Sequence, residues 1–317
     1  MPSRDVNISR AIATGRRHAV QVLRSRERAL KTRETALNRN PKRIELQIEP
    51  VSIAASRVVQ KTLFRTSGFL IAEGDSWFDY PWVDVLKLLK DHYGYTVKSV
   101  AHRGDAVEQM AYGGDQLEEF LRKIEELIDQ GLTPRAILLS GGGNDIAGRE
   151  FSMLLNHIAS PVQGLSDRVL QGVIDERTKY AYVTILSSVT DLCRKKLKKS
   201  IPIVLHGYDY PVPDGRGYLT GKWILPGPWL DPGFREKGFR DLARRKELAR
   251  VLIDRFNHML LEVSRLGAFS HVHYIDLRGT LSSGADYKQW WDNELHPTRK
   301  GFASVTKRFA DVLQELP

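Results

Sequence analysis

Five short apolar segments alternate with longer amphipathic segments between residue 68 and the C-terminus. We expect strands at 68–73, 95–101, 135–140, 201–206 and 272–277, and helices at 82–92, 115–130, 180–199, 235–265 and 298–313. Strands and helices that alternate in this way form a parallel sheet with helices on both faces. In such sheets, ligands bind beyond the carboxyl ends of the strands. The pattern therefore predicts an α/β fold with any active site in the loops that follow the strands.

The first of these loops presents a hydroxyl group. The apolar stretch at 68–73 stops at Gly74, and Asp75 and Ser76 follow at once. A Gly-Asp-Ser sequence is also ordinary turn chemistry, in which the polar side chains cap the next helix. Whether Ser76 is a nucleophile therefore depends on whether the other loops supply a base and donors for an oxyanion.

Two further loops carry groups that suit acyl transfer. The predicted strand at 135–140 runs into 141–145, which contains Asn144, and His296 comes just before the last amphipathic segment. Acyl transfer needs a nucleophile, a base that takes its proton, and donors aimed at the developing oxyanion. Ser76, His296 and Asn144 have the right chemistry for these three roles.

At these positions the chain resembles the SGNH hydrolases, the superfamily of GDSL-type esterases and lipases. The resemblance extends over residues 66–315, and its four blocks occur in family order: Gly74–Ser76, Arg103–Asp105, Gly142–Asp145 and His296–Pro297. It implies a three-layer α/β/α sandwich of the flavodoxin-like type, with a central parallel sheet of about five strands.

The resemblance also implies a role for each residue. Ser76 would be the nucleophile and would lend its backbone N–H to the oxyanion hole, with the Gly104 N–H and the Asn144 side-chain amide as further donors. His296 would be the base. The implied reaction is hydrolysis of a small-molecule, saccharide or lipid acyl ester through an acyl-enzyme, with no metal and no organic cofactor.

The third member of the triad departs from the family pattern. The family has an aspartate three residues before the histidine, where this chain has Asn293, flanked by Asp292 and Glu294. A carboxylate there fixes the imidazole tautomer and stabilises the imidazolium, whereas an amide can orient the ring but carries no charge. All three residues stay open as the partner of His296. An O-acyltransferase, or a binding or scaffold protein that has lost hydrolysis, also remains an alternative.

The stretch 207–234 combines many aromatic residues with proline. A loop of this length inside a compact domain is usually functional or disordered, and its aromatic content argues against disorder. We expect a lid or wall beside Ser76, the alternatives being a surface excursion or a subunit contact. The residues that we expect to contact substrate are Trp77, Tyr208, Tyr210 and Trp223.

The net charge of +10 is concentrated at the N-terminus. Residues 1–43 contain twelve basic and three acidic residues, whereas the rest of the chain contains 36 and 35. The high pI therefore does not indicate an anionic substrate. We expect residues 1–65 to form an extension with a helix at 15–37 and a short strand at 43–50, and residues 66–317 to form the hydrolase domain. The extension could pack across the domain or against a second subunit, touch nucleic acid or an anionic membrane, or be disordered.

The composition is that of a globular protein, with 42% hydrophobic and 27% charged residues. No run of eighteen apolar residues occurs, and the N-terminus lacks the apolar core of a secretory signal. We therefore expect a cytoplasmic protein without a transmembrane segment, although an Arg-rich, acid-poor N-terminus is also typical of an organellar transit peptide.

Overall fold

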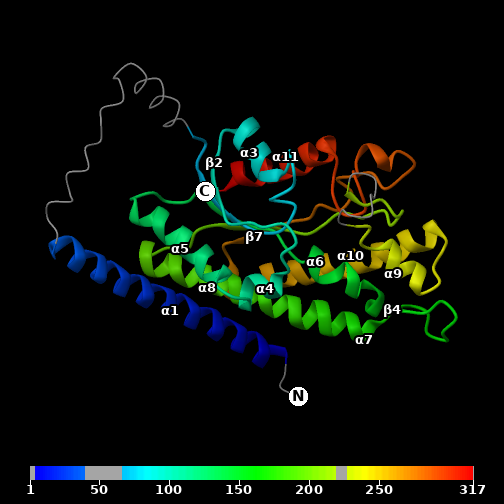
Figure 1. Cartoon of the computed structure of the whole chain (residues 1–317), viewed down its shortest axis with the longest axis horizontal. Helices are drawn as coiled ribbons and strands as arrows, with labels where there is room; N and C mark the ends of the chain where they lie inside the picture. Colours follow the sequence, from blue (N-terminus) through cyan, green and yellow to red (C-terminus); the bar gives the residue numbers. More distant parts are fainter. Residues whose placement is uncertain (1–3, 40–65, 219–226, 317) are drawn as a thin grey trace.

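A five-stranded sheet, parallel throughout, forms the centre of the molecule (Figure 1). The computed structural model describes residues 4–39, 66–218 and 227–316. The strands are β1 Phe69–Glu73, β2 Thr96–Ser99, β3 Ala136–Leu139, β6 Ile203–His206 and β7 Val272–Ile275. Each lies inside the range that the apolar pattern predicts, so these five predictions are confirmed. β3 and β6 are buried along their whole length because helices cover both faces.

Helices on both faces complete a three-layer α/β/α sandwich, which confirms the predicted fold class. Figure 1 shows α3 (Val85–Tyr93) and α11 (Arg299–Glu315) above the sheet, where the two helices pack together. The layer below contains α4 (Val107–Tyr112), α5 (Gln116–Asp129), α8 (Lys179–Leu197) and α10 (Leu242–Ser264). The chain begins α3 at the Asp84 cap, whose carboxylate accepts from Lys87 N–H, and ends it at Gly94 in the left-handed conformation.

The order of the strands fixes where the site can lie. The sheet runs β2-β1-β3-β6-β7, which is the flavodoxin-like order when the strands are counted along the chain. β1 leads to β2 on one side, and the chain then crosses to β3 on the other. A crevice therefore opens beyond the carboxyl ends of β1 and β3, which are the ends followed by Ser76 and Asn144.

The helices differ more than the strands from the sequence pattern. The predicted helix at 235–265 is two helices, because the chain turns at Gly238, where φ is +83°, between α9 (Asp231–Glu236) and α10. The predicted helix at 180–199 begins earlier, since α7 (Asp167–Leu170) and the π-helix η3 (Gln171–Thr178) lead directly into α8. The remaining short elements are α6 Gly143–Ile146, η2 Arg149–Leu154, the antiparallel pair β4 Leu155–Asn156 and β5 Gly164–Leu165, η5 Gly267–Phe269 and η6 Tyr287–Gln289.

A long basic helix, α1 (Arg4–Arg39), lies along α8 on the outside of the sandwich (Figure 1). Its small residues Ala11, Gly15 and Ala19 face α8 and let the two backbones approach closely. Ser188 Oγ donates to the Gly15 carbonyl across the contact, at 2.9 Å. Of the alternatives for the N-terminal extension, the structure contains the packed helix.

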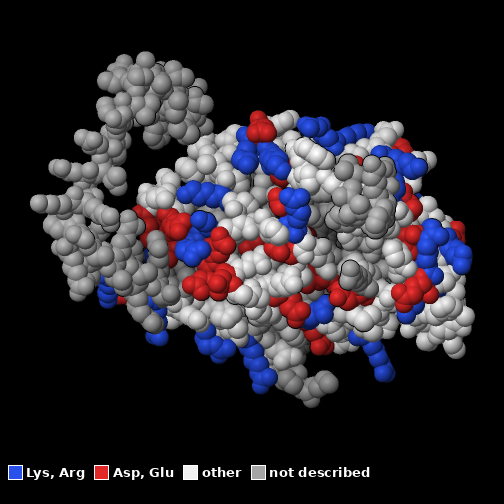
Figure 2. Space-filling view, in the orientation of Figure 1, with Lys and Arg blue, Asp and Glu red and all other residues white. Residues whose placement is uncertain are grey.

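Two predictions for the extension are not tested by this packing. The predicted strand at 43–50 lies outside the described residues, and the predicted boundary at 65/66 lies at the edge of an undescribed stretch, so both stay predictions. Figure 2 shows basic side chains along the lower edge of the molecule, where α1 runs. None of the helices that the structure describes has the length and hydrophobicity needed to cross a membrane.

We expect Gly15→Ala to destabilise the protein through the contact between α1 and α8. A Cβ atom at Gly15 would lie 2.4 Å from the Thr184 carbonyl oxygen, which cannot move aside without shifting α8. Such overpacking costs about 1–3 kcal/mol. The matched control is Gly172→Ala in η3, where an added Cβ meets nothing within 4 Å. Because alanine favours helix over glycine by about 1 kcal/mol, urea unfolding should show Gly172→Ala as neutral or stabilising, and equal effects of the two changes would contradict the tight contact.

Candidate active site

Three loops after strands, together with the loop before α11, place four predicted residues at one cleft. Ser76 lies in the turn after β1, Gly104 in the loop after β2, Asn144 in α6 after β3, and His296 in the loop before α11. All four line a cavity of about 390 Å³, hereafter the cleft. Cavities of about 300–1,000 Å³ are the usual size of small-molecule sites.

Ser76 and His296 are hydrogen-bonded to each other. Ser76 Oγ lies 2.7 Å from His296 Nε2, which is the contact that a serine nucleophile needs with its base. The turn that presents Ser76 is closed by the N–H groups of Phe78 and Asp79, which both donate to the Asp75 carbonyl. The nucleophile therefore sits on a defined turn rather than on a free loop.

Asn293 is the residue that contacts the other ring nitrogen of His296. Its Oδ1 lies 2.9 Å from His296 Nδ1 and also accepts the backbone N–H groups of Leu295 and His296, each at 3.0 Å. Two backbone donors on one atom identify that atom as the amide oxygen. Nδ1 must therefore carry the ring proton, which leaves the Nε2 lone pair facing Ser76 Oγ. The amide fixes the tautomer that a general base requires.

The Asp292 carboxylate is not in contact with the imidazole nitrogens of His296 and lies behind Asn293 and Tyr80. The Asn293 amide nitrogen donates to Tyr80 Oη at 3.0 Å, and Tyr80 Oη donates to Asp292 Oδ2 at 2.8 Å. Burial and the Asp292 carboxylate raise the pKa of Tyr80 above its usual value, so the phenol keeps its proton and remains a donor. The Tyr80 ring also stacks on the imidazole, with centroids 4.5 Å apart. The Asn293 amide nitrogen also lies 3.4 Å from Asp292 Oδ2, so a carboxylate charge lies next to Asn293, on the side away from the imidazole.

Glu294 faces away from the imidazole and holds the neighbouring loop. Its buried carboxylate accepts the backbone N–H groups of Gly215, Trp229, Leu230 and Asp231 at 2.7–3.1 Å. Burial raises the pKa of Glu294 to about 7. These bonds place the Trp229 ring 5.3 Å from that of His296, as one wall of the cleft. Of the three alternatives, only Asn293 is in contact with Nδ1.

The missing carboxylate has a consequence for pH dependence. Burial lowers the pKa of His296 to about 3, so the imidazole is neutral and able to accept a proton throughout the ordinary pH range. We expect Asn293→Asp to raise this pKa by about 1–3 units, because a carboxylate at Nδ1 stabilises the imidazolium. Activity requires the neutral ring, so kcat/KM of the variant should fall on the acid side between pH 4 and 7, where the wild type stays flat.

The control for this prediction is Asp292→Asn, which removes a charge that reaches the imidazole only through Tyr80 and Asn293. Loss of this charge lowers the pKa of His296 still further, so the profile of Asp292→Asn should stay as flat as that of the wild type between pH 4 and 7. The comparison is a set of kcat/KM values between pH 4 and 9 for the wild type and the two variants. An unchanged acid side in Asn293→Asp would contradict the placement of residue 293 beside Nδ1.

Two further groups on the cleft wall can act as oxyanion donors. Gly104 has a φ of +93°, and a Cβ there would meet nothing within 4 Å, so its backbone is open to the cleft. The Asn144 amide donates one N–H to the Asp105 carbonyl at 2.9 Å, and no hydrogen bond within the described parts of the chain uses the second. Asp145 accepts Val107 N–H at 2.9 Å, which ties the loop of Gly104 to α6.

The buried carboxylate of Asp75 links the turns that follow the strands. Asp75 Oδ1 accepts Trp77 N–H at 3.0 Å and Ser140 Oγ at 2.7 Å, while its Oδ2 accepts the Tyr208 hydroxyl. Ser140 in turn contacts His206 Nε2 at 2.8 Å. The network links the ends of β1, β3 and β6, and it fixes the position of the residue immediately before Ser76.

A second, smaller cavity lies behind the nucleophile. This inner pocket is also lined by Ser76, Asn144 and His296, and its volume is about 40 Å³. Two residues that we expect to contact substrate, Trp77 and Tyr208, line this pocket and not the cleft. Both are almost fully buried. The other walls are mostly apolar: Ile146, Ala147, Leu230, Leu252, Ile253, Trp291 and Leu295.

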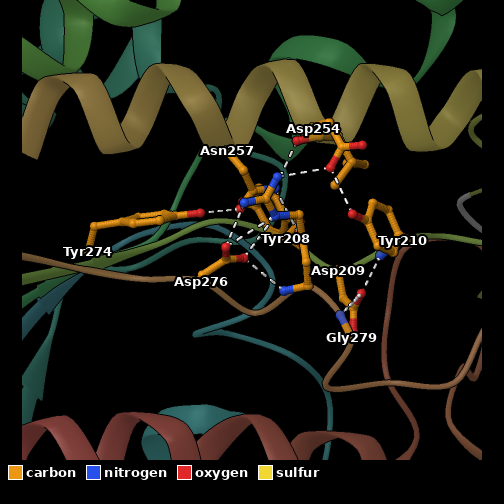
Figure 3. A network of polar contacts seen from close by, with 10 residues as sticks. Tyr208, Asp209, Tyr210, Asp254, Asn257, Tyr274, Asp276 and Gly279 are labelled. Atoms are coloured by element: carbon orange, nitrogen blue, oxygen red, sulfur yellow. Dashed lines mark hydrogen bonds and ion pairs between the residues drawn. The ribbon is translucent and has the colours of Figure 1, made fainter.

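Tyr210, a third expected substrate contact, lines neither cavity. Figure 3 shows it at the edge of a polar network between the end of β6, α10 and the loop after β7. Its hydroxyl donates to Asp254 at 2.7 Å, and its ring packs under the Arg250 guanidinium. Asp209 accepts the N–H groups of Tyr210 and Gly279 and so fixes the position of the chain around Tyr210. The fourth expected contact, Trp223, lies outside the described residues.

The cleft wall contains residues that sequence analysis did not assign to substrate: Tyr80, Pro81, Arg103, Tyr218 and Trp229. Tyr218 and Trp229 lie in the predicted aromatic loop, and Tyr80 follows Ser76 by four residues. Their aromatic character was a signal in the sequence, but the sequence does not show which way each side chain points. Within residues 4–39, 66–218 and 227–316, no cluster of three or more His, Cys, Asp or Glu side chains could hold a metal ion.

Comparison with known proteins gives one extended match. The model of the GDSL-like Lipase/Acylhydrolase family matches residues 70–303. No curated protein matches the chain significantly. Among solved structures, a catalytic mutant of an acetylxylan esterase from Geobacillus stearothermophilus is 14% identical with a TM-score of 0.39, covering 78% of this chain and 94% of its own. An alpha/beta hydrolase enzyme from the metagenome of Lake Arreo, Spain, is 14% identical with a TM-score of 0.38, covering 81% and 99%. At these TM-scores the likenesses support neither an activity nor a substrate for this chain.

Proposed function

Because this chain belongs to the GDSL-like Lipase/Acylhydrolase family, whose members hydrolyse esters, we propose that it is a serine esterase with Ser76 as its nucleophile and His296 as its base. The observation that carries the proposal is the 2.7 Å contact between Ser76 Oγ and His296 Nε2, at a point where the cleft and the inner pocket meet. The family match agrees with the resemblance drawn from the four sequence blocks.

The proposed reaction has two steps. His296 Nε2 takes the Ser76 proton while Oγ attacks the acyl carbon, and the carbonyl oxygen becomes an oxyanion that accepts from Ser76 N–H, Gly104 N–H and the free N–H of Asn144. The protonated imidazole then gives its proton to the departing alkoxide. The acyl group remains on Ser76 as an ester. Water, deprotonated by the same imidazole, attacks that ester and releases the carboxylic acid and free Ser76. The Asn293 oxygen keeps the ring in one tautomer through both steps.

The inner pocket favours a short acyl group. Its volume of about 40 Å³ accommodates about three water molecules. Trp77 and most of the other walls are buried side chains. We therefore propose that the acyl methyl group enters the inner pocket and that the alcohol part of the ester lies in the larger cleft.

Vinyl acetate and an acetyl ester of a larger alcohol provide the test, with the products identified by mass. The esterase proposal expects acetate to be released in water without any added acceptor. The same residues could serve an O-acyltransferase, which would release acetate slowly and acetylate an added alcohol instead. A scaffold protein that has lost hydrolysis would do neither, and this result would refute the proposal.

The exposed face of α1 remains a candidate surface for an anionic partner. Arg10, Arg16, Arg17 and Arg24 lie on it and are exposed, although the opposite face is packed against α8. The positive charge suits an anionic surface, and self-association is the other possibility that sequence analysis raised. Both are independent of the proposed esterase chemistry.

A further inference from the structure

A row of aromatic rings leads from the base toward solvent. The Tyr80 ring stacks on the imidazole of His296, and the Tyr218 ring meets Tyr80 edge-on, with centroids 5.9 Å apart. The Trp82 ring is nearly parallel to that of Tyr218, at 10° and 6.2 Å. The row ends at Trp82, whose exposed fraction is 71%. The reaction at Ser76 uses Tyr80 but requires neither Tyr218 nor Trp82.

The backbone holds Trp82 in a conformation that tryptophan rarely adopts. Its φ is +64°, in the left-handed region that favours glycine and asparagine. Val83 N–H donates to the Pro81 carbonyl at 2.8 Å and closes a three-residue turn around Trp82, and a positive φ at the centre of such a turn is its strained form. Strain of this kind is concentrated at functional sites. Here it accompanies a large apolar ring that is displayed to water beside the cleft instead of being packed in the core.

We propose that Trp82 and Tyr218, hereafter the aromatic platform, bind the sugar ring of an O-acylated saccharide while its acyl group is bound at Ser76. This inference rests on the esterase function proposed above. A pyranose ring has apolar C–H faces that pack flat on an open aromatic ring, and hydroxyl groups at its edge that stay hydrated. The exposed Trp82 ring, nearly parallel to the half-buried Tyr218 ring that lines the cleft, provides such a surface.

Charged groups at the cleft complement the hydroxyl edge of a sugar. Arg103 lines the cleft, and its Nε lies 3.3 Å from Asp79 Oδ2, with both side chains partly exposed. The pair can donate to and accept from hydroxyl groups. A long-chain lipid would require an enclosed apolar channel, whereas the outer end of the row is open and the inner pocket is small. The arrangement thus favours a saccharide over a lipid as the alcohol part of the ester.

The test compares an acetylated disaccharide with vinyl acetate, which has no ring to reach the platform. Asparagine tolerates a positive φ, so Trp82→Asn removes the ring and preserves the turn. We expect kcat/KM for the disaccharide ester, relative to that for vinyl acetate, to fall at least about tenfold in Trp82→Asn, a change of about 1.4 kcal/mol. Trp82→Tyr keeps a ring that can stack and should retain most of the wild-type ratio. Val162→Asn, which replaces another exposed apolar residue that does not line the cleft, should leave the ratio unchanged.

A binding measurement separates this inference from the esterase proposal. With Ser76→Ala as the background, saturation-transfer NMR should detect the acetylated disaccharide, and the double variant with Trp82→Asn should show clearly weaker transfer. If the wild type hydrolyses neither ester, the esterase proposal fails, and the NMR comparison still decides the platform. If vinyl acetate is hydrolysed but Trp82→Asn changes neither the ratio nor the transfer, the platform inference is wrong and the esterase proposal stands. Trp82-dependent self-association with no effect on saccharide binding would also overturn the inference.

Discussion

Ser76→Ala is expected to lower kcat for vinyl acetate at least about 1,000-fold. Removing the nucleophile of a serine hydrolase leaves only the contribution of the oxyanion donors and of binding, and in a well-studied serine protease the loss reaches about a millionfold. In this chain the hydroxyl at 76 is hydrogen-bonded to His296 Nε2, so the substitution removes both the attacking atom and the proton that the base accepts. The measurement is steady-state hydrolysis at pH 7, with the concentration of folded enzyme determined independently.

The control for this variant is Ser264→Ala. That hydroxyl donates to the Leu261 carbonyl in its own helix and lines neither cavity, so its removal should leave kcat within about twofold. A Ser76→Ala protein that folds and keeps more than a tenth of the wild-type kcat would mean that another group attacks the ester. In that case the two-step mechanism would have to be abandoned.

Asn144→Ala should produce the second largest loss, about 100- to 1,000-fold in kcat with little change in KM. A donor to the oxyanion acts mainly in the transition state, and removal of one side-chain donor of this kind costs about 2.7–4 kcal/mol. The structure leaves one N–H of the amide for this role, since the other donates to the Asp105 carbonyl. The expected signature is therefore a fall in kcat and kcat/KM by the same factor.

A competing explanation for such a loss is displacement of the loop that carries Gly104, because Asn144 also binds Asp105 in that loop. Thermal unfolding separates the two explanations. Asp145 continues to hold Val107, so the loop should stay in place and the midpoint should shift by only a few degrees. A proportional rise in KM with unchanged kcat would show that Asn144 binds the ground state and would contradict its oxyanion role.

The sheet was predictable from sequence because its central strands are short apolar runs between turn residues and the whole chain alternates strands with helices. Ile137 and Leu138, for example, are buried on opposite faces of the sheet, so the sequence is apolar from Ala136 to Leu139 without interruption. The meeting of Ser76 and Asn144 followed from the same reasoning, because parallel strands end at one edge. The family resemblance added His296 and Gly104 to this set. The strand pattern and the family resemblance together therefore predicted the four residues that meet in the cleft.

The walls of the site were not predictable because they depend on side-chain direction. Tyr208 and Tyr218 belong to the same aromatic loop, yet the first turns inward to Asp75 and the second lines the cleft. Both residues are tyrosines, so the sequence does not distinguish them. The folded loop determines which way each side chain points. The partner of His296 was likewise undecided, since the choice of Asn293 depends on two backbone donors that hold its oxygen toward the ring. Short helices such as α4 have too few turns to show a helical period.

Labelling with a fluorophosphonate shows directly whether Ser76 is an activated nucleophile, because the reagent modifies a serine that an adjacent base activates. We expect a single adduct on the wild-type protein, located on Ser76 by peptide mass spectrometry. We also expect that His296→Ala, which leaves the serine but removes the base, reacts far more slowly. A wild-type protein that is folded yet unlabelled, or labelled at a serine other than Ser76, would contradict the convergence of Ser76, His296 and Asn144 on one acyl carbon.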